Sequence, residues 1–128
     1  MAAVPPTAPL VLIVDDSDRN RKLARDVLRA GGLRTIEAAD GHEAVALAAE
    51  SLPDVILLDL RLPDMDGREV AGALRDDVRT RRIPLVALSA SSYGGDHDAL
   101  SAEGFAGCLE KPIDVQAFPG QVRSYCCT

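Results

Sequence analysis

The sequence predicts an α/β fold in which a parallel sheet is covered by helices on both faces. Short, uninterrupted apolar runs alternate along the chain with segments whose apolar residues recur at helical spacing. An apolar run without polar alternation is typical of a strand buried on both faces, and such strands belong to parallel sheets. Consecutive strand–helix units of this kind are joined by right-handed crossovers. Five such units fit within the 128 residues of the chain.

The first unit is the clearest. Residues 10–14 are all apolar and predict a buried strand. Ser17 or Asp18 can cap the helix that follows, which we expect to end near Ala30, before a pair of glycines. The outer face of this helix is basic, and we expect solvent to cover it. The residues of this face are Arg19, Arg21, Lys22, Arg25 and Arg29.

The other elements are predicted from the same patterns. The strands are expected at residues 34–38, 55–58, 85–88 and 106–110, and the helices at about 42–51, 66–76, 96–103 and from near 114. The strand at 34–38 alternates between polar and apolar residues, which favours a place near an edge of the sheet. Pro119 and Gly120 fall inside the last helix, so we expect that helix to be short, kinked or frayed.

The domain organisation is simple. We expect a disordered lead over residues 1–9, one domain over residues 10–125 and a short tail over residues 126–128, with no second domain. The lead has neither the basic start nor the apolar core of a signal peptide. No stretch is long enough to span a membrane.

Charge and cysteine content narrow the classes of function. A net charge of −6 argues against a nucleic-acid-binding protein, which would need a basic face. The three cysteines, Cys108, Cys126 and Cys127, have neither zinc-site spacing nor the even number of a disulfide framework. Reduced thiols and a cytoplasmic location are therefore expected.

Polar residues follow the predicted strands where ligands bind in open α/β sheets, at the carboxyl ends. Asp15 and Asp16 follow the first strand, and Asp59 follows the central one. We expect a flavodoxin-like (βα)5 sandwich with strand order 2-1-3-4-5, in which these two strands are neighbours and their carboxylates converge. Three converging carboxylates need a cation, and oxygen ligands suit Mg²⁺. Ser89 and Lys111 follow two other strands and could bind a phosphoryl group carried by Asp59.

These motifs resemble the receiver domain of two-component response regulators over residues 10–125. The matching segments are Val14-Asp15-Asp16, Leu58-Asp59-Leu60-Arg61-Leu62-Pro63-Asp64-Met65-Asp66-Gly67, Leu88-Ser89-Ala90 and Glu110-Lys111-Pro112. Each segment alone is a weak indication. Together they occur in the family's order, and each lies at a predicted strand end.

The resemblance implies a role for each site residue. Asp59 would be phosphorylated by a histidine kinase or a histidine phosphotransfer protein. Asp15, Asp16, Asp59 and the backbone carbonyl of Arg61 would hold Mg²⁺, for which Mn²⁺ can substitute. Ser89, Ala90 and Lys111 would form the phosphate-binding and switch group, and Pro112 would follow a cis peptide bond.

The resemblance also implies a signalling role rather than an enzymatic one. We expect a stand-alone regulator, monomeric or weakly dimeric, that binds no nucleic acid and no membrane. Phosphorylation would change its binding to an unidentified downstream protein. The change would act through the Ser89 loop and the face formed by the fourth helix, fifth strand and fifth helix. Family members usually carry Tyr or Phe three residues before the lysine, where this chain has Cys108. This departure indicates a weaker signalling motion or one carried by other residues.

Two alternatives stay open at this point. The chain could be the receiver module of a larger hybrid kinase or phosphorelay protein. It could also be a phosphatase of the haloacid-dehalogenase class, which uses a strand-end aspartate and Mg²⁺. That class needs a second aspartate two residues after the nucleophile, where this chain has Arg61.

Overall fold

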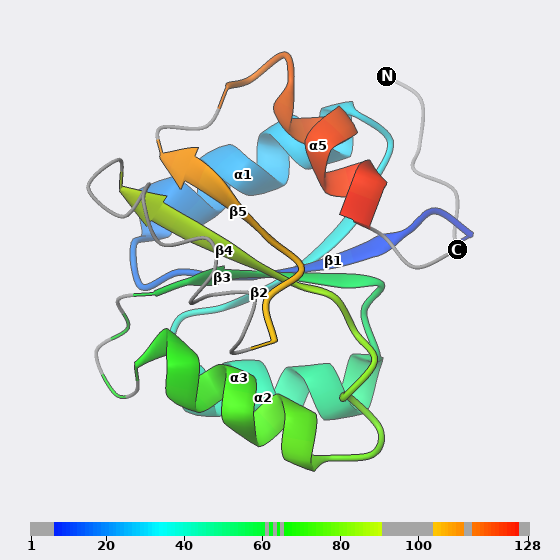
Figure 1. The fold of residues 1–128 in the computed structure, drawn as a ribbon. Coiled ribbons are helices and arrows are strands. Elements are labelled where there is room, and N and C mark those ends of the chain that lie inside the picture. The colour runs from blue at the N-terminus through cyan, green and yellow to red at the C-terminus, as the bar shows by residue number, and fades with distance from the viewer. Residues whose placement is uncertain are drawn as a thin grey trace.

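A five-stranded parallel sheet forms the centre of the protein (Figure 1). The computed structural model describes residues 7–60, 62, 64, 66–90, 104–111 and 114–125, and residues 89, 90, 110 and 111 by their backbone alone. The strands are β1 (Leu10–Val14), β2 (Arg34–Ala38), β3 (Val55–Asp59), β4 (Leu85–Ala90) and β5 (Gly107–Lys111). Their order is β2-β1-β3-β4-β5, so the flavodoxin-like fold predicted from the sequence is confirmed.

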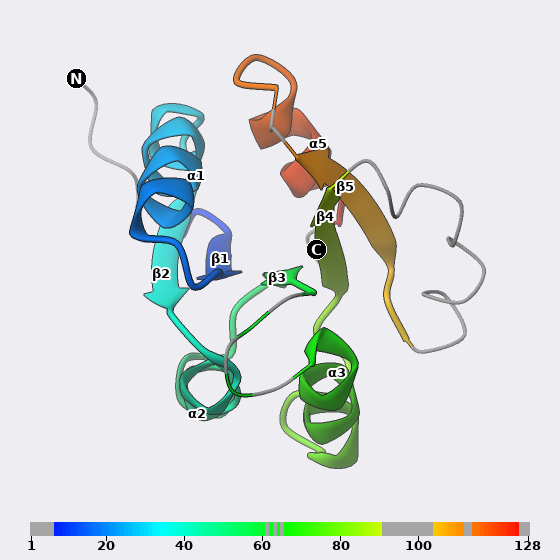
Figure 2. The ribbon, with the colours of Figure 1, turned by 90° about the vertical axis from the view of Figure 1, so that its left-hand side faces the viewer.

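Helices cover both faces of this sheet. They are α1 (Asp18–Ala30), α2 (Gly41–Ser51), α3 (Gly67–Asp76) and α5 (Phe118–Tyr125). Figures 1 and 2 show α1 and α5 on one face and α2 and α3 on the other. The helix expected at residues 96–103, the lead up to residue 6 and the tail from residue 126 lie outside the described residues. No helix in the described ranges has the length and apolar character needed to cross a bilayer.

The alternation of side chains along each strand produces two hydrophobic cores. Val11 and Ile13 of β1 pack beneath α1 and α5, whereas Leu12 and Val14 of the same strand pack against α2 and α3. All four of these side chains are at most 1% exposed. Burial on both faces is the reason that the apolar runs show no polar alternation.

The last helix begins later than the sequence predicts. Residues 115–117 form a turn, and α5 starts at Phe118. Asp114 caps that turn by accepting the backbone N–H groups of Gln116 and Ala117 at 3.0 and 3.3 Å. Pro119 therefore lies in the first helical turn, where its missing N–H leaves no intrahelical bond broken.

The close contact between α1 and α5 leads to a stability prediction. A Cβ atom added at Gly31 would lie 2.6 Å from Cβ of Pro119, and the rigid ring cannot turn away. Gly31→Ala should therefore lower the free energy of unfolding by about 1–3 kcal/mol. A Cβ at Gly72, inside α3, would meet nothing within 4 Å. Gly72→Ala should raise the free energy of unfolding by about 0.5–1 kcal/mol. Urea denaturation measures the free energy of unfolding of both variants. A change of the same sign and size in the two variants would contradict the packing described here.

Candidate functional site

The first part of the site is the turn between β1 and α1. The backbone N–H of Asp15 donates to the carbonyl of Ala38 in β2 at 3.1 Å. The hydrogen bonding between β1 and β2 therefore continues one residue beyond the end of β1. Oδ1 of Asp15 accepts the backbone N–H of Ser17 at 2.9 Å, and the residue is 1% exposed. Ser17 in turn caps α1 by accepting the N–H of Asn20. Asp16, the next residue along, is exposed. The turn thus presents one buried and one exposed carboxylate.

The second part of the site is the end of β3. Asp59 is the last residue of that strand and is 9% exposed. The chain after it is held by Gly67, whose N–H donates to the carbonyl of Leu60 at 3.2 Å. A Cβ atom at Gly67 would lie 2.9 Å from Cα of Leu60 and 3.3 Å from the carbonyl oxygen of Asp59. Only glycine allows the start of α3 to approach the Asp59 backbone this closely.

The two parts meet because β1 and β3 are adjacent in the sheet. Carboxylate oxygens of Asp15, Asp16 and Asp59 all lie within 4.8 Å of one another. At this separation three negative charges repel unless a cation neutralises them. An all-oxygen set with one exposed member can bind a hard cation that keeps part of its water shell, and Mg²⁺ is such a cation. The residues present therefore fit the Mg²⁺ predicted from the sequence.

The other predicted site residues lie along the same edge of the sheet. Asp59 is opposite Leu88 of β4, and the backbone of Ser89 follows it. In the β4–β5 ladder Ala90 is opposite Lys111. β4 thus ends beside Asp59 and β5 ends one strand further along the sheet, but the side chains of Ser89, Ala90 and Lys111 are outside the described part. Arg61 and Pro112, predicted as a carbonyl ligand and a cis proline, also lie outside it.

Cys108 lies further back in β5, opposite Ala87 of β4. Its side chain is partly buried and packs against the core beneath α2 and α3, which includes Phe105. In the described structure Cys108 therefore acts as part of the hydrophobic core.

One interaction near the site could not be predicted from sequence patterns. Asp64 lies in the segment between β3 and α3, and its carboxylate binds the amino end of α2. It accepts the backbone N–H of Gly41 at 2.8 Å and that of His42 at 3.1 Å, and it pairs with Nδ1 of His42. Asp40 caps the same helix through the N–H of Glu43. Asp64 thereby ties the segment after Asp59 to a helix more than 20 residues earlier in the chain.

This contact predicts a pH-dependent contribution to stability. The N–H of Gly41, with smaller effects from His42, lowers the pKa of Asp64 from 3.8 to about 2. Because the pKa is lower in the folded state, the stabilisation is complete above about pH 4 and is lost as the pH falls through about 2. Asp64→Asn should lower the urea midpoint at pH 6, and its difference from wild type should shrink between pH 4 and pH 2. A constant difference across that range would contradict this role.

Comparison with known proteins agrees with the fold. The family model described as the response regulator receiver domain matches residues 11–123. The polar-differentiation response regulator DivK of Brucella anthropi is 41% identical over 115 residues, which are 90% of this chain and 94% of DivK.

Two solved structures are similar over nearly all of the chain. Chemotaxis response regulator CheY4 of Vibrio cholerae has a TM-score of 0.85 at 30% identity, with 93% of this chain and 99% of that chain covered. The receiver domain of the sensor histidine kinase PA1611 of Pseudomonas aeruginosa has a TM-score of 0.83 at 30% identity, with 93% and 98% covered. That structure has a magnesium ion coordinated in its active site cleft.

Proposed function

The chain belongs to the response regulator receiver domain family, and on that basis we propose that it is a single-domain response regulator phosphorylated on Asp59. The donor is a histidine kinase or a histidine phosphotransfer protein. Its role is signalling: the phosphoryl group changes the affinity of the protein for a downstream partner. The observation that carries the proposal is the convergence of Asp15, Asp16 and Asp59 within 4.8 Å at the ends of adjacent strands.

The proposed reaction is transfer of a phosphoryl group between two side chains. A carboxylate oxygen of Asp59 forms a bond to phosphorus while the bond from phosphorus to the donor's imidazole nitrogen breaks, and the imidazole keeps the bonding electrons. Mg²⁺, when bound, supplies positive charge to the phosphoryl oxygens. β3 fixes the direction of Asp59 because the strand is buried along its whole length.

Asp15 and Asp16 hold the cation in this proposal, together with Asp59 and the carbonyl of Arg61. Asp15 is preorganised by the Ser17 N–H, whereas the exposed Asp16 leaves room for water ligands. Lys111 binds a phosphoryl oxygen, and Ser89 binds another and draws its loop toward the site. Ala90 is small and leaves the phosphoryl group accessible.

The partner-binding surface in this proposal follows from the strands that carry Ser89 and Lys111, which end along the same edge of the sheet as the acidic cluster. A change at Ser89 or Lys111 acts on β4 and β5, and β5 lies at the open edge of the sheet. We place the partner-binding surface on β5, α5 and the segment between β4 and β5. A cytoplasmic location and a monomeric or weakly dimeric state complete the proposal.

A nuclear magnetic resonance titration tests the proposed switch. Beryllofluoride mimics a phosphoryl group on a carboxylate without requiring the cognate kinase. Adding it with Mg²⁺ to ¹⁵N-labelled protein should shift the amide resonances of Asp59 and of the ends of β4 and β5. The resonances of the Asp59→Asn variant should not shift. Changes confined to residues around Asp59 would contradict a switch that reaches the β5 edge.

A further inference from the structure

The side chain of Arg21 makes a set of contacts that the sequence did not predict. Its helix face was expected to be solvated, yet this side chain is only 14% exposed. Each guanidinium nitrogen has a different acceptor. Nη1 donates to the backbone carbonyl of Asp15 at 2.6 Å, Nη2 binds the carboxylate of Asp18, and Nε lies 3.5 Å from the carboxylate of Glu37.

The carbonyl contact is the important one, because it acts on the peptide bond that joins Asp15 to Asp16. A peptide group is planar, so a donor that fixes the carbonyl oxygen of Asp15 also fixes the orientation of the N–H of Asp16. The two acids that flank this plane both belong to the acidic cluster. Through its hydrogen bond to the backbone carbonyl of Asp15, Arg21 therefore constrains the directions in which the carboxylates of Asp15 and Asp16 point.

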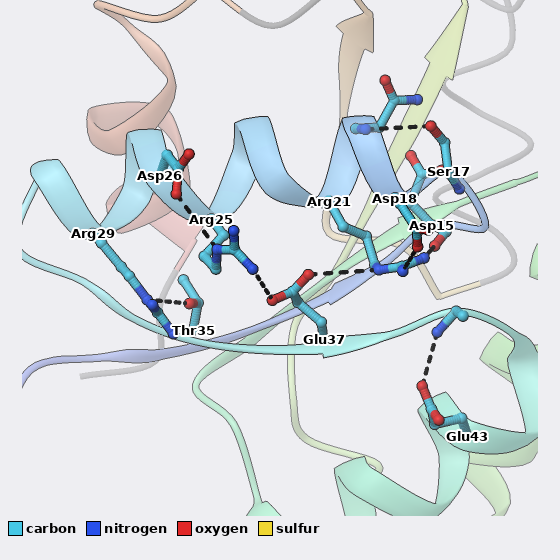
Figure 3. A network of polar contacts seen from close by, with 12 residues as sticks. Asp15, Ser17, Asp18, Arg21, Arg25, Asp26, Arg29, Thr35, Glu37 and Glu43 are labelled. Atoms are coloured by element: carbon cyan, nitrogen blue, oxygen red, sulfur yellow. Dashed lines mark hydrogen bonds and ion pairs between the residues drawn. The ribbon is translucent and has the colours of Figure 1, made fainter.

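The position of Arg21 is fixed from a second element. Glu37 lies on β2, and it also accepts a hydrogen bond from Nη1 of Arg25 at 3.1 Å. Figure 3 shows Glu37 between the two arginines, with α1 on one side and β2 on the other. Since β2 is paired with β1 along its whole length, the contact of Arg21 with Glu37 connects the turn that carries Asp15 to the rigid sheet, and Arg25 is not part of that connection.

We propose that Arg21 is a positioning residue for the divalent-cation site, holding the peptide between Asp15 and Asp16 in the orientation that binds Mg²⁺. The inference rests on the proposed function, since it assigns a residue to that same cation site. Partners that orient ligands without touching the metal typically change metal affinity by about 10–100-fold when removed. Loss of the Arg21 contact should therefore raise the dissociation constant for Mg²⁺ by about tenfold.

Simple electrostatics predicts the opposite change in Mg²⁺ affinity, and this difference makes the inference testable. Removing a positive charge beside an acidic cluster strengthens the attraction of that cluster for a cation. Arg25→Ala is the matched control, because Arg25 lies on the same helix and shares Glu37 but has no hydrogen bond to Asp15. Arg25→Ala should leave the Mg²⁺ affinity unchanged or slightly increased, whereas Arg21→Ala should decrease it.

The test is calorimetric titration of Mg²⁺ alone into wild type, Arg21→Ala, Arg21→Lys and Arg25→Ala. Lysine keeps the charge and can donate to the Asp15 carbonyl, but it cannot bind three acceptors in a fork. Arg21→Lys should therefore bind Mg²⁺ with an affinity between those of wild type and Arg21→Ala, and it serves as the test variant if Arg21→Ala does not fold. Circular dichroism without metal establishes that each variant is folded.

The outcomes separate this inference from the function on which it rests. An affinity of folded Arg21→Ala equal to or higher than that of wild type would overturn the positioning role, and so would an equal loss in Arg25→Ala. Wild-type protein that binds no Mg²⁺ would instead contradict the cation site itself. Because only metal binding is measured, neither result depends on finding the phosphoryl donor.

Discussion

Asp59→Asn should remove all phosphorylation of the protein by acetyl phosphate in the presence of Mg²⁺. Asparagine has the size of aspartate, so the buried end of β3 keeps its packing. The amide is a poor nucleophile and cannot form the acyl phosphate. Incorporation of labelled phosphate should fall to the background of a reaction without protein, while the far-ultraviolet circular dichroism spectrum stays that of the wild type.

An exposed acid provides the control for this variant. Asp76 lies at the end of α3, outside the acidic cluster, and is exposed. Asp76→Asn makes the same chemical change and should be phosphorylated at the wild-type rate. One phosphoryl group retained in Asp59→Asn would assign the acceptor to another residue.

Asp16→Ala should lower the affinity for Mg²⁺ by about two orders of magnitude. Two unit charges about 4 Å apart near a protein surface interact by about 4 kcal/mol, and a tenfold change in affinity corresponds to about 1.4 kcal/mol. Removal of one carboxylate from a three-carboxylate cluster therefore has a large effect, even after the relief of repulsion in the metal-free protein is subtracted. Calorimetric titration measures the change directly.

Thermal unfolding gives a second measure of the Mg²⁺ affinity that Asp16→Ala is expected to lose. A cation that binds only the folded chain raises the melting temperature of the wild type. The same concentration of Mg²⁺ should leave the melting temperature of Asp16→Ala nearly unchanged, while Asp76→Ala should respond as the wild type does. An unaltered Mg²⁺ titration of Asp16→Ala would remove this residue from the cation site.

The fold could be predicted because strand burial is visible in short stretches of sequence. The apolar runs at residues 10–14 and 55–58 are buried on both faces, and this requires a sheet with helices on both sides. The acidic cluster could be predicted from the same strand assignments, because the carboxyl ends of parallel strands lie at one edge of the sheet. Asp15, Asp16 and Asp59 could be brought together without any knowledge of side-chain conformation.

The contacts that tie the site to distant elements could not be predicted in this way. Asp64 binds the start of α2 across 23 residues of sequence, and no periodicity indicates such a pair. For Arg21, the spacing to Asp18 predicts an ion pair on one helix face, but it says nothing of the Asp15 carbonyl or of Glu37 on β2. The start of α5 was misplaced because a proline is compatible with the first helical turn, as Pro119 shows.

The most direct test of the central claim is to locate the phosphoryl group by mass spectrometry. The wild-type protein is incubated with acetyl phosphate with and without Mg²⁺, its intact mass is measured, and borohydride then reduces the acyl phosphate to mark the modified residue. We expect a gain of one phosphoryl group that requires Mg²⁺ and a mark on the peptide that contains Asp59. A mark on another residue, or an equal gain without Mg²⁺, would contradict the assignment of Asp59 as a metal-assisted phosphoryl acceptor.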